Sequence, residues 1–468
     1  MTTKRRHARD ASKATPARRA ALALARAVRE QNAYLSGLAP QIFSRFQLEA
    51  SDRAFAHLLA QGVVSLQTTL DAVIDEVLRS PRDIKDDVRD ALRIAAYEIL
   101  YLGKEEHAAV DQGVELVRQV APRATGVANF VLHRIVEERS RFPYGDPTCS
   151  LEAATLYYGF PAWLSRAIEK DIGTNNALSL MRGSLQAAPI WFTPNACRMT
   201  SGELVRFLEA AKIEFNTCES LIALDSPDQA AIFQLVDRGN VGDPAFLTLL
   251  EEDKIVVSDL SAQSITSLAA SLVPRTNARV LEIGAGRGTK TLQLQSLCAL
   301  RGVSFEAYEV VDVKPKKIEQ LEARIERAGG TITQALVHDA TTPFPQEPGT
   351  FDLVFIDAPC TGVGTLRRHP EIKARLGEED STSLAKIGQA MLEQACTLVK
   401  PEGSLLYSTC TIFKEENEQV IERFLGSSVG AVFETVAIGA DGTVFFNTPI
   451  TPHGPDLHFA ALLRRKAR

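Results

Sequence analysis

The sequence predicts a multidomain protein, with an all-helical part first, a small α+β segment next and an α/β domain at the C-terminal end. Three observations predict this class. The chain has 468 residues, which suffices for two or three domains. Apolar residues recur at helical spacing over roughly the first third of the chain. From about residue 278 onwards, apolar strands alternate with helices.

The all-helical part is expected over residues 17–140. In DDVRDALRIAAYEILYLG, apolar residues recur every three or four positions, which is the period of a helix with one buried face. DRAFAHLLAQGVVSLQTTLDAVIDEVL behaves likewise, with a possible cap at Ser51. Residues 1–16 form a basic tail that either neutralises phosphates or stays solvated. Residues 141–150, RFPYGDPTCS, are typical of a linker rich in turns.

The middle segment, residues 151–270, has a mixed pattern and is expected to be a small α+β unit. TLYYGFPAWLSRAIEKDIG predicts a helix that begins after a proline, and PIWFTPN and KIVVSDL predict short strands. Residues 271–468 then predict five apolar strands: RVLEIG, SFEAYEVVD, ITQALVHD, FDLVFIDA and GSLLYSTC. Helices are expected to begin near Thr289, Lys314, Thr382 and Lys414. Such alternation indicates a parallel sheet that is covered on both faces.

The composition argues against membrane-spanning, zinc-binding and disulfide-stabilised proteins. The chain is 45% hydrophobic and 24% charged, as in ordinary soluble proteins, and contains no apolar run long enough to span a membrane. The seven cysteines are scattered without a CxxC pair. This argues for a reducing compartment and against a zinc site or a disulfide framework. We therefore expect a cytoplasmic protein without metal, and the net charge of −6 does not by itself indicate nucleic-acid binding.

The residues that could bind a ligand or take part in a reaction lie at the ends of the predicted strands. Ligands of an open parallel sheet bind outside the carboxyl ends of its strands. In chain order these ends hold a glycine loop (GAGRG), Asp312, Asp339, Asp357 followed by Cys360, and Cys410. An acid after the second strand commonly binds ribose hydroxyls, so Asp312 is the first candidate and Glu309 the second. The simpler alternatives are helix N-terminal charges for the acids and inert core positions for the thiols.

Two motifs that each contain a cysteine resemble those of a known enzyme family. DAPCTGVGTLRRHPEIKAR (357–375) and YSTCTIFKEENEQVI (407–421) resemble the RNA cytosine-5 methyltransferases, and RRHPEIK resembles the bacterial 16S ribosomal RNA branch of the Fmu/Sun (RsmB) type. SDLSAQS (258–264) and TPHGPDLHFAALLRR (451–465) resemble further parts of that branch. DRAFAHLLAQGV, EEHAAV and ANFVLHR resemble its NusB-like helical domain. The resemblance implies a NusB-like RNA-binding domain over 17–140 and a Rossmann-like class I methyltransferase domain over 271–468.

The resemblance also implies the role of each candidate residue. Cys410 would attack carbon 6 of a cytosine, Asp357 would bond N3 and face the cofactor, and Cys360 would assist product release. The cofactor, S-adenosyl-L-methionine, would bind at Gly284, Ala285, Gly286, Arg287, Gly288, Thr289, Lys290, Asp312, Asp339 and Asp357, with Asp312 on the ribose and Asp339 near the adenine. RNA phosphates would contact Arg367, Arg368, His369 and Lys373.

One departure from the family pattern affects the cofactor loop. The family usually has CAAPGGKT where this chain has GAGRGTKT, so Arg287 stands at a proline position and Thr289 at a glycine position. The implied partner is an RNA, 16S rRNA in particular, and we expect a monomer that does not bind membranes. Two alternatives stay open. A nicotinamide-dependent oxidoreductase would have GxGxxG and would leave both motif cysteines unexplained. A non-catalytic RNA-binding or ribosome-assembly protein with a degenerate cofactor loop would not need Cys410, Cys360, Asp357 and Lys290.

Overall fold

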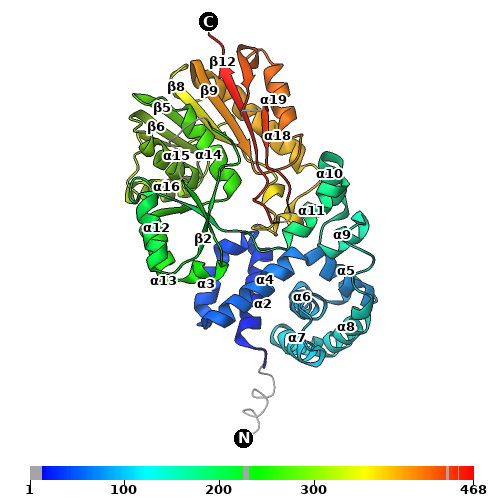
Figure 1. The fold of residues 1–468 in the computed structure, drawn as a ribbon. Coiled ribbons are helices and arrows are strands. Elements are labelled where there is room, and N and C mark those ends of the chain that lie inside the picture. Colours follow the sequence, from blue (N-terminus) through cyan, green and yellow to red (C-terminus); the bar gives the residue numbers. More distant parts are fainter. Residues whose placement is uncertain (1–12, 225–230, 439–441, 452, 468) are drawn as a thin grey trace. The chain divides into compact units, whose positions relative to one another are not determined.

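The computed structural model describes residues 13–224, 231–438, 442–451 and 453–467, which fold into two compact units (Figure 1). The first unit is helical and contains the chain up to Gln186 together with Leu366–Leu376. The second unit contains Ala187–Thr365 and the chain from Gly377 onwards. Most of the expected basic tail lies outside the described residues. Among the residues described, no helix has the length and apolar character needed to cross a membrane.

The helical unit is built around one helix that is buried on nearly all sides. This is α6, Asp86–Leu100, which packs against α2, α4, α5, α7 and α8. The unit consists of α2 (Pro16–Gln31), α3 (Leu35–Phe46), α4 (Ala50–Ser65), α5 (Gln67–Val77), α6, α7 (Glu106–Val120), α8 (Thr125–Glu138), α9 (Leu151–Tyr157), α10 (Ala162–Ile172) and α11 (Thr174–Ser184), with α17 (Ile372–Arg375) added from the later segment. The cap expected at Ser51 is wrong, because α4 already begins at Ala50 and Glu49 occupies its N-cap position.

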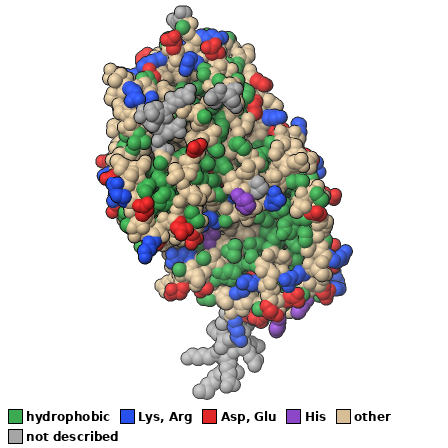
Figure 2. All heavy atoms as spheres, viewed as in Figure 1, with side chains coloured by type: hydrophobic (Ala, Val, Ile, Leu, Met, Phe, Trp, Pro, Cys, Tyr) green, Lys and Arg blue, Asp and Glu red, His purple; other side chains and the backbone are tan. Residues whose placement is uncertain are grey.

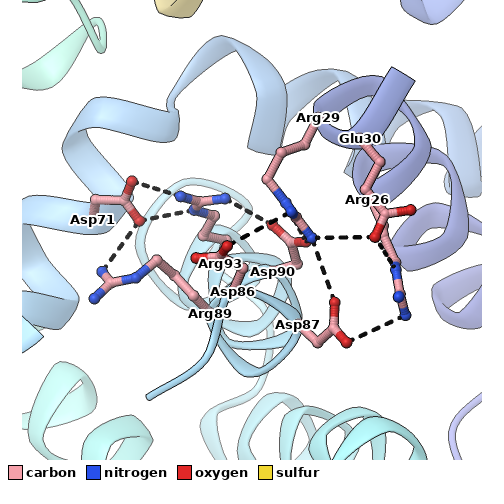
Figure 3. A network of polar contacts seen from close by, with 9 residues as sticks. All are labelled: Arg26, Arg29, Glu30, Asp71, Asp86, Asp87, Arg89, Asp90 and Arg93. Atoms are coloured by element: carbon pink, nitrogen blue, oxygen red, sulfur yellow. Dashed lines mark hydrogen bonds and ion pairs between the residues drawn. The ribbon is translucent and has the colours of Figure 1, made fainter. Parts of the chain in front are cut away.

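A network of arginines and aspartates joins α2, α5 and α6 inside this unit (Figure 3). Arg29 of α2 donates two hydrogen bonds to Asp90 of α6, at 3.0 and 2.9 Å. Arg93 of α6 donates two to Asp71 of α5, at 2.8 and 2.6 Å. Burial raises the pKa of Asp90, and the two arginines beside it oppose that shift. Much of the positive charge in these helices is therefore used to hold them together.

The second unit begins with a small antiparallel sheet. Its strands are β1 (Trp191–Pro194), β2 (Phe215–Cys218), β3 (Ile232–Leu235) and β4 (Ile255–Val257), in the order β2-β3-β1-β4, with α12 (Ser201–Ala210) and α13 (Pro244–Glu251). The Asn195 side chain ties this sheet to its surroundings by donating to the carbonyls of Asp253 and Ala328, both at 2.9 Å. The expected segment 151–270 is thus divided, because α9–α11 pack with the helical unit and the strands with the second unit.

The large sheet of the second unit has the order β10-β12-β9-β8-β5-β6-β7, with β11 paired to β12. The strands are β5 (Ala278–Ile283), β6 (Phe305–Asp312), β7 (Gln334–Val337), β8 (Phe351–Asp357), β9 (Val399–Thr409), β10 (Phe433–Val436), β11 (Phe445–Asn447) and β12 (Phe459–Arg465). The five predicted strands pair in parallel, as expected, but β12 adds to β9 in the antiparallel sense and carries β10 and β11 with it.

Helices cover both faces of this sheet (Figure 1). One face packs against α14 (Leu260–Leu272), α15 (Thr289–Leu300) and α16 (Pro315–Arg327), and the other against α18 (Asp380–Ala395) and α19 (Glu418–Leu425). Successive strand residues point to opposite faces, so Leu353 joins the first core and Val354 the second. On the face drawn in Figure 2, acidic and basic side chains are interspersed rather than separated into large patches of one sign.

Candidate active site

The glycine loop lies between β5 and α15, at the carboxyl edge of the sheet. Gly284, Gly286 and Gly288 have φ values of 79°, 61° and 78°, which only glycine adopts without strain. A Cβ on Gly284 would lie 2.3 Å from the carbonyl oxygen of Asp357, so glycine there lets the loop pack against the end of β8. The loop therefore places the N-terminus of α15 next to the last residue of β8.

Arg287 and Thr289 stand at two of the four positions at which this loop departs from the family pattern. Arg287 is exposed, and the Thr289 hydroxyl accepts a hydrogen bond of 2.8 Å from Nη1 of Arg324 on α16. A Cβ on Gly286 would meet a single neighbouring atom within 4 Å, at 3.9 Å, so open space adjoins the middle of the loop. The Thr289 side chain is thus bonded to α16 and does not fill this space.

Lys290 and Asp357 form an ion pair at the start of α15 and the end of β8. The Lys290 Nζ lies 2.5 Å from Oδ2 of Asp357, and the Ser408 hydroxyl donates to Oδ1 of Asp357 at 3.4 Å. Burial by itself would lower the pKa of Lys290, but the attraction and hydrogen bond of Asp357 outweigh it and raise that pKa. Lys290 is therefore a fixed positive charge at this edge of the sheet.

The two motif cysteines lie together beyond the ends of neighbouring parallel strands. Asp357 of β8 is paired in register with Ser408 of β9, and the loops that follow bring the sulfurs of Cys360 and Cys410 to 3.3 Å. The hydrogen bond to Cys410, followed by burial, raises the pKa of the Cys360 thiol well above its ordinary value. The Cys360 thiol is therefore held in its neutral form.

Gly364 joins three motifs at this point. Its N–H donates to the carbonyl of Cys410 at 3.0 Å, and its carbonyl accepts from the N–H of Leu457, also at 3.0 Å. A Cβ on Gly364 would lie 1.9 Å from the oxygen of Leu457. The glycine thus allows the DAPCTGVG loop to pass between the YSTCT segment and the segment that leads into β12.

The acids expected to contact a cofactor lie at the ends of β6 and β7. Asp312 is buried, and its carboxylate accepts from the N–H of Gly286 at 3.0 Å and from that of Lys314 at 2.9 Å. Glu309 lies deeper in β6 and accepts from Gln346. Asp339 is exposed in the loop after β7, where the N–H and hydroxyl of Thr341 bond one oxygen and lower the pKa of its carboxyl. Asp312 is therefore directly joined to the glycine loop.

The basic residues after the DAPC motif belong to the helical unit. Lys373 is 2% exposed, donates to the carbonyl of Tyr158 at 2.8 Å and lies over the ring of Phe160. Burial lowers the pKa of this lysine to about 7. The expectation that Lys373 contacts RNA phosphates is wrong on this geometry, because its ammonium points into the protein. Arg367 donates to the carbonyl of Gly183 at 3.1 Å, and the ring of His369 contacts that of Tyr34.

Sequence reasoning missed the polar residues that support the two cysteines. These are Thr361, Thr409, Thr411, Glu416 and Asn417, all of them buried and joined by hydrogen bonds in the second unit. A signal was present, because Glu416 and Asn417 stand in the same quoted motif as Cys410 and follow an apolar stretch. Nothing local to that motif distinguishes a buried acid from a solvated helix start, however.

Two family models and several known proteins match this chain. Residues 269–462 match the family 16S rRNA methyltransferase RsmB/F, and residues 15–137 match the NusB family. The ribosomal RNA small subunit methyltransferase B of Pasteurella multocida is 27% identical over 448 residues, covering 94% of this chain and 93% of its own. The corresponding Escherichia coli protein is 25% identical over 444 residues, covering 93% and 96%.

A solved structure shares the fold. The crystal structure of PH0851 matches 96% of this chain and 99% of its own, with a TM-score of 0.76 at 24% identity. The chain therefore shares its fold with a known structure. The two cysteine motifs lie within the residues that match the methyltransferase family model. The chain is therefore similar to the NusB family over residues 15–137 and to the 16S rRNA methyltransferase RsmB/F family over residues 269–462.

Proposed function

We propose that this protein methylates carbon 5 of a cytosine in RNA, most specifically in 16S rRNA, through a covalent bond between Cys410 and the base. One observation carries the proposal. Two thiols lie 3.3 Å apart at the carboxyl ends of adjacent parallel strands, in the loops that follow the residue pair Asp357 and Ser408. Attack on a substrate requires one thiol. A reaction that adds a sulfur to the base and later removes it can use a second thiol for the release.

The cofactor of the reaction is S-adenosylmethionine, and the residues at this edge fit it. Gly284, Gly286 and Gly288 keep the loop backbone open, and α15 begins directly after it, so N–H groups of its first turn face the loop. Asp312 provides a carboxylate next to Gly286 that can bond ribose hydroxyls. When bound there, the cofactor supplies an electrophilic methyl group.

The protein's own residues activate the base. Carbon 5 of cytosine is a weak nucleophile until a thiolate adds to carbon 6, and Cys410 is placed to make that sulfur–carbon bond. Negative charge would otherwise build on the ring near N3. Asp357, whose carboxyl lies 2.5 Å from the Lys290 ammonium, would deliver a proton to N3 as the sulfur adds, so that the ring stays neutral. Carbon 5 thereby becomes able to form its bond to the methyl group.

Release requires that the carbon-5 proton leaves and that the Cys410–carbon-6 bond breaks. Cys360 begins as a neutral thiol whose pKa is raised first of all by its hydrogen bond with Cys410. Once the Cys410 sulfur is bonded to carbon, that hydrogen bond weakens and Cys360 can release its proton to water. The Cys360 thiolate then takes the carbon-5 proton, and the electrons of the C–H bond expel Cys410.

The test uses 16S rRNA transcribed without modifications and incubated with the protein and S-adenosylmethionine. Bisulfite sequencing should then reveal a single protected cytosine. The Cys410→Ala protein should leave every cytosine converted, while binding the cofactor with unchanged affinity in titration calorimetry. Methylation by Cys410→Ala at the wild-type level would overturn the covalent mechanism. Failure of the wild type to bind millimolar cofactor would favour a non-catalytic RNA-binding protein.

A further inference from the structure

The sheet fixes the two cysteine loops only up to their first residues. Ladder pairing between β8 and β9 ends at Asp357 and Ser408, and one more hydrogen bond joins the N–H of Ala358 to the carbonyl of Ser408 at 2.9 Å. Cys360 and Cys410 both lie beyond this point. Loops outside a ladder move more freely than the strands they follow, so the 3.3 Å approach of the sulfurs requires a further restraint.

Glu416 supplies a restraint that reaches both loops. Its Oε2 accepts from the N–H of Thr361 at 2.8 Å, and its Oε1 accepts from the Thr361 hydroxyl at 2.7 Å and from the Thr411 hydroxyl at 3.4 Å. Thr361 follows Cys360 and Thr411 follows Cys410. The two hydroxyls also lie 2.7 Å from each other. One carboxyl group therefore connects the residues next to the two thiols.

Asn417 holds the Cys410 loop from both sides. Its Oδ1 accepts from the Thr409 hydroxyl at 2.6 Å, and its Nδ2 donates to the carbonyl of Thr411 at 3.0 Å. Cys410 is the residue between these two threonines. The hydroxyl of Tyr407, on β9, also donates to the carbonyl of Glu416 at 2.9 Å, which fixes the backbone that carries both polar side chains.

Burying the polar side chains of Glu416 and Asn417 costs free energy of folding. Glu416 is 1% exposed and Asn417 is fully buried, and burying a carboxyl group with only neutral donors around it is unfavourable. Apolar residues of the same size would pack the turn between β9 and α19 at lower cost. Hydrogen bonds from residues that flank the two cysteines instead reach both polar side chains.

We propose that Glu416 and Asn417 are positioning residues that, with Thr361, Thr409 and Thr411, form a cysteine clamp holding the Cys360 and Cys410 loops together. The clamp does not touch the base or the cofactor. It keeps the attacking sulfur and the releasing sulfur at a fixed separation while the bond to carbon 6 forms and breaks. Its importance for turnover rests on the proposed function, but its effect on the two thiols does not.

The first measurement therefore needs neither RNA nor cofactor. Diamide oxidises two neighbouring thiols to a disulfide: both S–H bonds break, one S–S bond forms, and the reagent takes up the two protons and two electrons as a hydrazine. Peptide mass mapping follows the Cys360–Cys410 crosslink over time. In Glu416→Ala its rate should fall roughly tenfold to a hundredfold, because a displacement of about 1 Å has effects of this size on well-oriented reactions.

Two other variants separate the clamp from general folding. Glu416→Gln can still accept from the Thr361 N–H and can donate to a hydroxyl, so its crosslinking rate should stay within about threefold of the wild type. Glu415→Ala removes the neighbouring carboxylate, which bonds Thr382 instead, and should crosslink like the wild type. If Glu416→Ala does not fold, Thr361→Val removes the bridging hydroxyl at similar volume and should show the same loss of rate.

The second measurement is turnover on RNA at saturating cofactor. Glu416→Ala should lower kcat by a similar factor and leave the KM for RNA and the cofactor dissociation constant unchanged, with kcat restored in Glu416→Gln. Wild-type crosslinking in both Glu416→Ala and Thr361→Val would overturn the clamp. Slow crosslinking in these variants, with a wild type that transfers no methyl group, would support the clamp and refute the proposed function.

Discussion

At the scale of single residues, the two motif thiols affect each other through their mutual contact. Each cysteine follows a strand, and isolated cysteines in such places are usually inert. Here the hydrogen bond between the sulfurs keeps the proton on Cys360.

Replacing Cys360 with alanine should stall the reaction after attack by Cys410. The sulfur–carbon bond can still form, but no group remains to take the carbon-5 proton, so the adduct should accumulate. A denaturing gel of the variant with substrate RNA and S-adenosylmethionine should show a slowly migrating protein–RNA band. Cys149→Ala, which changes an exposed cysteine of the helical unit, should give no such band. Normal turnover by Cys360→Ala would mean that this thiol only packs.

Replacing Asp312 with alanine should weaken cofactor binding by about 1.5–3 kcal/mol, because ribose hydroxyls lose a charged acceptor. The variant also frees the N–H of Gly286, so part of the loss would come from a less ordered loop. Titration calorimetry on the two proteins measures the difference. The matched variant Glu309→Gln should bind normally, and weakening in Glu309→Gln with normal affinity in Asp312→Ala would move the ribose contact to Glu309.

At the scale of elements, the candidate active site is made by turns that follow strands, and small residues decide how closely these turns approach. The first turn packs against β8 through Gly284, and the DAPCTGVG turn passes between two carbonyls through Gly364. Strands fix direction and register, but each turn needs its own means of contact.

Replacing Gly364 with alanine should therefore impair the site even though the backbone angles there suit alanine. The added Cβ would lie 1.9 Å from the carbonyl oxygen of Leu457 and 2.8 Å from that of Cys410, so backbone must move. Overpacking of this kind typically costs about 1–3 kcal/mol. Thermal unfolding should show that loss, together with a larger relative loss of kcat. Gly242→Ala, where the Cβ meets no atom within 4 Å, is the control and should leave both unchanged.

At the scale of the whole molecule, a segment within the residues that match the methyltransferase family, Leu366–Leu376, belongs to the helical unit. Leu366–Leu376 follows the Cys360 motif in sequence, yet its basic side chains bond the backbone carbonyls of Gly183 and Tyr158 in the helical unit. Lys373 is the most buried of these, and burial lowers its pKa to about 7. Lys373 in that position destabilises the fold whenever its amine is protonated.

The stability of the helical unit should therefore rise with pH above 7. In the unfolded chain Lys373 has the ordinary pKa of 10.5, so between pH 7 and 10.5 the unfolded state binds one more proton than the folded state. The free energy of unfolding then increases with pH, by about 2–3 kcal/mol from pH 7 to pH 9. Below pH 7 both states are protonated and the full penalty applies. Lys373→Met should lose this dependence.

The measurement is urea unfolding followed by the fluorescence of Trp163, which lies in α10, in a Trp191→Phe background. Lys170→Met, an exposed lysine of the same helix, is the control and should keep the wild-type dependence on pH. An equal rise of stability with pH in Lys373→Met would show that other groups cause it.

The sequence by itself determined the parallel strands, the helices between them, the glycine loop and the two cysteine motifs, because these depend on local periodicity and on residue types at strand ends. The tertiary structure alone decided which polar residues are buried. Lys373 has the local pattern of an exposed basic turn, and Glu416 that of a solvated helix start, yet both are nearly inaccessible. Antiparallel β12 and the transfer of Leu366–Leu376 to the helical unit were likewise decided there. Burial is a property of contacts between residues far apart in the chain, and no pattern within one segment records it.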